Sequence, residues 1–209
     1  MSHAVTAALS HLRSTDHLSW AVVGLFAVVV WIYSQTIRSG RLDEALLALA
    51  FTCVEACVEV GNGLVLHATG RAPVWSAPGD TSYLIYVGLP IELLFLFALL
   101  PLALFNLLPA DRDRRIAGLP NRMVVPIAFG FFALGVEVVL NAAGATAWEW
   151  WFWRRPWVVL PALTYCGLMV GLTWLNDHMS RRLRLLVLSL AAASWLVAHL
   201  VFAAWLGWV

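Results

Sequence analysis

The stretch ALLALAFTCVEACVEVGNGLVLH, Ala45 to His67, decides how the whole chain is read. It is apolar almost throughout and is long enough to cross the hydrocarbon core of a bilayer, which takes ~20 residues of helix. Two carboxyl groups, Glu55 and Glu59, nevertheless lie within it. An ionisable side chain at membrane depth is costly, so it usually faces a cavity or a partner and carries a function. The stretch therefore predicts a membrane-spanning helix with an acidic face.

The rest of the chain has the same apolar character. Of its 209 residues, 62% are hydrophobic and 12% are charged, which is the composition of a multi-pass membrane protein. Six stretches are long enough to span a membrane: Leu18–Ile37, Ala45–Leu66, Tyr83–Leu108, Met123–Ala143, Trp157–Asn176 and Leu185–Val209. The first is too long for the core of a cleavable signal peptide. We expect an all-α, polytopic membrane helical bundle of about six helices, forming one domain over residues 1–209.

The basic residues predict the orientation of this bundle, and all thirteen are arginines. Nine fall on one side of the expected bundle: Arg38, Arg41, Arg112, Arg114, Arg115, Arg122, Arg181, Arg182 and Arg184. Four fall on the other side: Arg13, Arg71, Arg154 and Arg155. The positive-inside rule then places both termini outside the cytoplasm, as expected for a bacterial plasma membrane protein surrounded by membrane lipids. A net charge of +1 does not favour binding to nucleic acid, and the sequence leaves the oligomeric state open.

The two acids of the second span are the first candidate site. Glu55 and Glu59 are one helical turn apart and project from one face, which Thr52 and Asn62 extend. Removal from water favours a neutral carboxyl group, and a neutral acid can give its proton to an alkene or epoxide. The alternative is a structural acid that only makes hydrogen bonds inside the bundle.

Two further acids are expected to lie in apolar helices. Glu92 follows Pro90 in VGLPIELLFLF, where a proline bends the helix and can open a cavity. Its alternative role is to satisfy the broken helical turn. Glu137 and Asn141 are four residues apart in ALGVEVVLNAAG and make a second, shorter polar stripe.

Two aromatic loops lie on the side of the termini. Ala68–Ser82 contains Trp75, and Gly144–Pro156 contains Trp150 and Trp153. Such residues commonly sit at the headgroup level of a membrane, and the alternative is a lid that closes a pocket.

A weak two-unit internal repeat joins the loops to the acids. Trp75 follows Glu59 by sixteen residues, and Trp153 follows Glu137 by the same interval. A Leu-Pro pair comes next in each unit. Membrane folds often place a site where such repeats meet.

Several classes of chemistry find no support in the sequence. The chain has no G-x-G-x-x-G, Walker or G-x-S-x-G motif, so nucleotide binding and serine hydrolysis are not indicated. Its histidines do not cluster as di-iron oxygenases require. Cys53 and Cys57 lack a second thiol pair to complete a zinc site. We therefore expect neither a metal nor a cofactor.

Three stretches resemble known families. YSQTIRSGRLDEALLALAFTCVEACVEV resembles the start of the integral-membrane meroterpenoid cyclases of fungi and actinobacteria, with Glu55 in the place of their glutamate and Val54 in the place of a tryptophan. VGLPIELLFLF is similar to the Pro-Ile-Glu-Glu helix of bacterial carotenoid hydratases and small-subunit lycopene cyclases. Glu92 matches the first glutamate of that motif, and Leu93 replaces the second. WEWWFWRRPWVVLPALTYCG loosely resembles a second such unit.

Both resemblances imply that a neutral carboxylic acid protonates an alkene or epoxide of an isoprenoid lipid or a prenylated small molecule. The carbocation then cyclises, loses a proton or gains water, without metal. Our leading expectation is a proton-initiated terpene cyclase, an isomerase or lyase. Its catalytic acids would be Glu55, Glu59, Glu92 and Glu137, and its lining residues Asn62, Trp75, Asn141, Trp150 and Trp153. Alternatives are a carotenoid hydratase or lycopene cyclase, a proton-coupled transporter, and an accessory subunit without catalysis.

Overall fold

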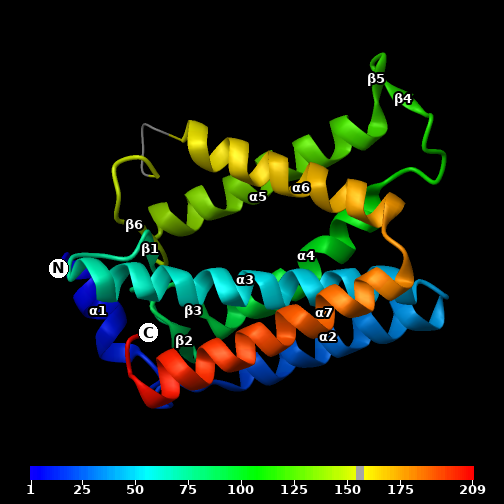
Figure 1. Ribbon diagram of the computed structural model, residues 1–209. Coiled ribbons are helices and arrows are strands. Elements are labelled where there is room, and N and C mark those ends of the chain that lie inside the picture. The colour runs from blue at the N-terminus through cyan, green and yellow to red at the C-terminus, as the bar shows by residue number, and fades with distance from the viewer. Residues whose placement is uncertain (154–157) are drawn as a thin grey trace.

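The computed structural model describes residues 1–153 and 158–209. Its helices run up and down beside one another (Figure 1). They are α1 (His3–His11), α2 (Trp20–Arg38), α3 (Leu42–Thr69), α4 (Ile91–Leu107), α5 (Asn121–Ala142), α6 (Val159–His178) and α7 (Arg181–Ala198), which continues into the π-helix η1 (His199–Trp205). The expected all-α membrane helical bundle is confirmed. Within the described residues, α2, α3, α5, α6 and the joined α7–η1 are long and apolar enough to cross a membrane, and α4 is shorter.

In the part of the chain that the structure describes, three short antiparallel strand pairs lie in the loops between helices. They are β1 (Trp75–Ser76) with β6 (Ala147–Trp148), β2 (Leu84–Tyr86) with β3 (Leu89–Pro90), and β4 (Arg115–Ile116) with β5 (Leu119–Pro120). The hairpins β2–β3 and β4–β5 each end in Leu-Pro, and a helix begins at the next residue. Proline suits this place because it has no N–H to leave unpaired at the start of a helix.

The third expected span, Tyr83–Leu108, was predicted to begin too far toward the N-terminus. Its first residues form the hairpin β2–β3, and the helix begins only at Ile91. The residues of the hairpin are as hydrophobic as those of α4, so hydropathy does not distinguish the two elements. Only Gly88 and Pro90, which favour turns, mark the boundary before α4.

The helices form two layers. The α5–α6 pair lies on one side, and α2, α3, α4 and α7 lie on the other, with the strand pair β1–β6 between the layers at one end (Figure 1). α5 and α6 pack closely against each other, whereas α3 and α6 meet at few positions. The outer faces of α2 and α7 expose large apolar side chains, as a lipid-facing surface does.

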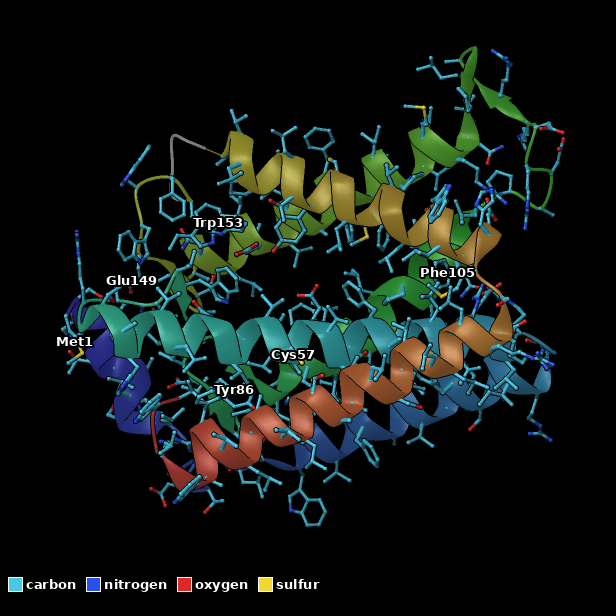
Figure 2. The ribbon with its side chains drawn as sticks, viewed as in Figure 1. Met1, Cys57, Tyr86, Phe105, Glu149 and Trp153 are labelled. Atoms are coloured by element: carbon cyan, nitrogen blue, oxygen red, sulfur yellow. The ribbon has the colours of Figure 1, made fainter. Side chains whose placement is uncertain are left out.

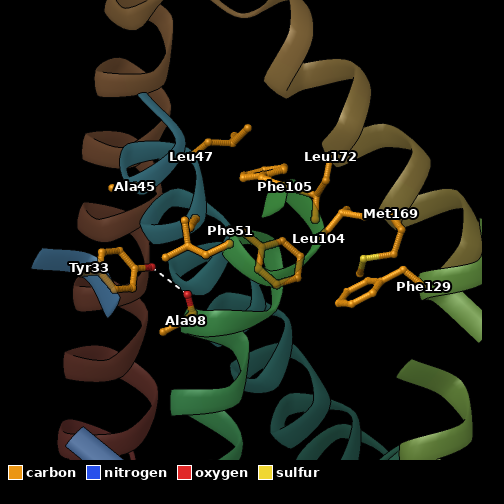
Figure 3. Packing of buried hydrophobic residues seen from close by; sticks show 12 residues of the cluster. Tyr33, Ala45, Leu47, Phe51, Ala98, Leu104, Phe105, Phe129, Met169 and Leu172 are labelled. Atoms are coloured by element: carbon orange, nitrogen blue, oxygen red, sulfur yellow. Dashed lines mark hydrogen bonds between the residues drawn. The ribbon is translucent and has the colours of Figure 1, made fainter. Parts of the chain in front are cut away.

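One hydrophobic cluster joins the two layers toward the opposite end (Figure 3). Phe105 of α4 is buried there together with Phe129 of α5 and Met169 of α6. The hydroxyl group of Tyr33 donates to the carbonyl oxygen of Ala98 at 2.8 Å, one turn before Pro101 of α4. This cluster therefore lies between the middle of α4 and the arginine-rich end of the molecule.

Ion pairs, and hydrogen bonds from a buried arginine, hold the helices together at that arginine-rich end. Asp177 of α6 accepts from Arg122 Nε at 2.8 Å and pairs with Arg112 at 3.3 Å. Arg184 is 4% exposed, and its guanidinium group donates to the carbonyl oxygens of Asp43 at 2.7 Å and Asn176 at 2.6 Å. These bonds tie the ends of α3, α6 and α7 together.

Candidate functional site

Glu59 of α3 lies at the centre of a buried hydrogen-bonded unit. Its side chain is 2% exposed, and its Oε1 accepts from the indole Nε1 of Trp75 at 2.9 Å. Asn62, one turn further along α3, donates to the carbonyl oxygen of Trp75 at 2.8 Å and accepts from the backbone N–H of Val74 at 2.7 Å. Asn62 therefore holds strand β1 where the Trp75 indole reaches the acid.

Gly88 closes this unit from the hairpin β2–β3. A Cβ atom at this position would lie 2.6 Å from Nδ2 of Asn62, 2.6 Å from Cδ1 of Trp75 and 2.7 Å from Oε2 of Glu59. All three separations are well inside van der Waals contact. Only glycine lets the backbone approach the acid this closely.

Glu137 of α5 lies in a second unit of the same kind. Its Oε1 accepts from the indole Nε1 of Trp148 at 2.6 Å, and its Oε2 accepts from the hydroxyl group of Tyr165 of α6. Asn141, one turn further along α5, donates to the carbonyl oxygen of Thr146 at 3.1 Å. In each unit, an acid and an asparagine on one helix hold the loop that follows, and a tryptophan from that loop donates to the acid.

The two units meet through the strand pair β1–β6. Trp75 and Trp148 are direct register partners in this antiparallel pair. The two-unit repeat predicted from the sequence is therefore present, but its alignment was wrong, because the counterpart of Trp75 is Trp148 and not Trp153. α3 continues for ten residues beyond Glu59 and α5 for only five beyond Glu137, so intervals counted from the acids do not match. Counted from the last helical residue, both tryptophans come six residues later.

The acids of the two units interact. Glu55 lies one turn before Glu59, and Glu59 has electrostatic interactions with both Glu55 and Glu137. The hydroxyl group of Tyr165 donates to Glu137 and lies within electrostatic range of Glu55 and Glu59. Among the described residues, no hydrogen bond is made to the carboxyl group of Glu55. Glu55 and Glu59, the distant Glu137 and Tyr165 thus form one cluster between α3 and the α5–α6 pair.

Trp153 of the second loop packs against Trp75, the tryptophan that donates to Glu59. Its ring centroid lies 5.7 Å from that of Trp75, with the two planes inclined by 35°. Its indole Nε1 is buried and has no hydrogen-bond partner among the described residues. Figure 2 shows Trp153 at the same end of the molecule as Glu149.

Two of the expected site residues lie outside the cluster. Glu92 accepts from the hydroxyl group of Thr81 at 2.6 Å and from the backbone N–H of Ser82 at 2.8 Å, so it fastens the loop before α4. Trp150 donates to the carbonyl oxygen of Ala72 at 3.2 Å, and the guanidinium carbon of Arg71 lies 5.3 Å from its ring centroid. Trp150 therefore joins the two aromatic loops to each other.

The N-terminal helix completes the cover over this end. Glu149 accepts from the hydroxyl group of Ser76 at 2.9 Å and from that of Ser2 at 3.0 Å. Val5 and Ala8 of α1 are fully buried. Residues of α1, β1 and the second aromatic loop therefore form one hydrogen-bonded cover. Arg154 and Arg155, expected on this side, lie outside the described residues.

Sequence reasoning missed Trp148, Tyr165 and Gly88. A tyrosine in an apolar helix needs a partner for its hydroxyl group, and this was the available signal for Tyr165. Two hollows among the described residues lie away from the acids. One is a groove of about 510 Å³ on the outer face of α7 and η1 that includes Ser194 and Phe202, and the other is a gap of about 70 Å³ beside Val209.

Comparison with known proteins places the chain among membrane proteins. The model of an uncharacterized membrane protein family matches residues 2–204. A protein of Archaeoglobus fulgidus, described as an uncharacterized protein, is 36% identical over 177 residues, which is 84% of each chain. No solved structure matches the chain.

Proposed function

The chain belongs to this family of integral membrane proteins. From the geometry of its acids, we propose that it is an enzyme that protonates an isoprenoid lipid inside the membrane. The proton goes to a carbon–carbon double bond or an epoxide, and the carbocation that results is guided to a cyclised product. One observation carries the proposal, namely the gathering of Glu55, Glu59 and Glu137 with tryptophan rings between two apolar layers.

The roles of the acids follow from their hydrogen bonds. Glu55 is bound by no donor among the described residues, so its carboxyl group is the one free to turn toward a substrate and give up a proton. General acid catalysis of this kind contributes ~10²–10⁴-fold to a rate. Glu59 is held by Trp75 at 2.9 Å and lies one turn away, so it is placed to return a proton to Glu55 between turnovers.

The tryptophan rings suit the charge that forms next. A desolvated cation over an aromatic face gains ~2 kcal/mol or more, and tryptophan provides the strongest face. Trp75 and Trp153 lie side by side next to the acids. The apolar layers exclude water, which would otherwise trap the cation before it cyclises.

The indole N–H of Trp153, which has no partner among the described residues, favours a substrate that carries oxygen. A buried donor without a partner costs ~1–3 kcal/mol, and a substrate that accepts its hydrogen bond removes this cost. An epoxide or a prenylated molecule with a hydroxyl or carbonyl group supplies such an acceptor, whereas a plain polyene does not.

The test is turnover by the purified protein in lipid nanodiscs. Isoprenoids of several lengths, each with and without a terminal epoxide, are analysed by mass spectrometry. We expect conversion of an epoxide, with Glu55→Gln reducing the rate by ~10²–10⁴-fold. Glu92→Gln is the matched control, because Glu92 lies outside the cluster, and its rate should stay close to that of the unmodified protein.

Two results would count against the enzyme. One is the absence of conversion across the whole panel. The other is proton movement into sealed vesicles coupled to a solute without product, because intramembrane acids also serve transporters. Normal turnover in Glu55→Gln would remove Glu55 from the role of acid.

A further inference from the structure

The two acid units differ in one respect, which is the number of donors around the carboxyl group. Among the described residues, Glu59 receives one close donor, the Trp75 indole, since its second oxygen lies 3.5 Å from Nδ2 of Asn62. Both oxygens of Glu137 are occupied, one by Trp148 at 2.6 Å and the other by the hydroxyl group of Tyr165. The repeat explains the difference, because Tyr165 comes four residues after Pro161 whereas Leu94 comes four residues after Pro90.

Two donors on one carboxyl group match its ionised form. An ionised carboxylate only accepts hydrogen bonds, whereas a neutral acid must use one oxygen to carry its proton. Bonds to the charged form are shorter and stronger than bonds between neutral groups. The hydroxyl group of Tyr165 has no other acceptor among the described residues. The surroundings of Glu137 are therefore arranged for a proton acceptor, and those of Glu55 for a donor.

We propose that Glu137 is the base that ends the reaction. Tyr165 and Trp148 are the positioning residues that keep its carboxylate ionised and oriented. This inference rests on the proposed function. In the last step a C–H bond next to the cationic carbon breaks, its electron pair forms a new C=C bond, and the proton binds Glu137. Glu55, which gave a proton in the first step, regains one from Glu137 through Glu59. No proton is consumed over the cycle, so the product is an isomer of the substrate.

Infrared difference spectroscopy tests the division of roles without any substrate. In nanodiscs, the difference between the unmodified protein and Glu137→Gln should show loss of carboxylate bands. The difference for Glu55→Gln should show loss of the C=O band of a neutral carboxylic acid. Tyr165→Phe should move the Glu137 signal from the carboxylate bands to the C=O band. Tyr33→Phe is the matched control, because it also removes a buried hydroxyl group from an apolar helix, and it should move neither signal.

The outcomes separate this inference from the proposed function. A neutral C=O band assigned to Glu137 in the unmodified protein would overturn the role of base, even if isoprenoids are converted. Glu137→Asp, which keeps the carboxyl group, provides the same assignment if Glu137→Gln does not fold. With an active substrate, we expect Tyr165→Phe to lower turnover by roughly tenfold, as loss of one hydrogen bond to the base would. It should also yield isomers with the double bond elsewhere, a change that a purely structural tyrosine would not cause. An unchanged isomer ratio would also overturn it.

Discussion

Replacing Gly88 by alanine should disrupt the Glu59 unit, and the structure gives the size of the effect. The added methyl group would lie 2.6 Å from Nδ2 of Asn62 and 2.7 Å from Oε2 of Glu59. Neither atom can yield freely, because Asn62 is bonded to the carbonyl oxygen of Trp75 and Glu59 to the Trp75 indole. Loss of one buried hydrogen bond costs ~1–3 kcal/mol, and overpacking costs a further ~1–3 kcal/mol. We therefore expect Gly88→Ala to lower the free energy of unfolding by about 2–6 kcal/mol.

The assay is thermal unfolding of the purified protein in mild detergent, followed by tryptophan fluorescence. For a chain of this size, each kcal/mol shifts the midpoint by roughly 2–4 °C. Gly61→Ala is the matched control, since Gly61 lies on the same helix as Glu59 and a Cβ atom there meets nothing within 4 Å. Its midpoint should stay level or rise slightly, because alanine favours a helix over glycine by ~1 kcal/mol. Equal midpoints for the two variants would refute the reasoning that the hairpin and the acid are in obligatory close contact.

Three further predictions concern the aromatic wall, the arginine-rich end and the orientation. Trp75→Phe should keep more activity than Trp75→Leu, and the leucine variant should release less-cyclised products, because only the phenylalanine keeps an aromatic face; equal product profiles by mass spectrometry would contradict this. Arg184→Ala should lower the free energy of unfolding by about 3 kcal/mol, since the buried guanidinium group leaves several carbonyl oxygens unpaired, whereas the exposed Arg182→Ala should have little effect. Cysteine labelling from outside the cell should reach Ala68–Ser82 and miss Asp111–Arg115, and the reverse pattern would invert the orientation.

The sequence predicted the membrane bundle well, because an apolar run of sufficient length determines a spanning helix with little help from tertiary contacts. It also brought Glu55, Glu59 and Glu137 into consideration, since each is conspicuous in apolar surroundings. The hairpin before Ile91 was missed because its residues are as apolar as those of the helix that follows. Hydropathy alone does not distinguish the two.

The partners of the acids were harder to predict. Trp148 was passed over because the interval was counted from Glu137, whereas the loop is anchored at the end of α5. Tyr165 lies on a different helix from Glu137, and no local period connects two positions 28 residues apart. Such a pairing depends on the rotation of α6 about its own axis, which tertiary packing sets.

The attachment of the α5–α6 pair determines how the interior of the protein can be reached. The pair is fastened to the other layer at one end by the strands β1 and β6 and toward the other end by Arg184, which bonds to Asn176 on α6. Between these points α3 and α6 share few contacts. On the α4 side the cluster around Phe105, Phe129 and Met169 adds a further attachment, so the opening is on the α3 side. A helix pair held in this way turns most easily about the line that joins its attachments. Such a rotation would part the layers sideways, toward the acyl chains, while the cover over the aromatic loops stays shut. A lipid could then pass between bilayer and acids without crossing the headgroup region.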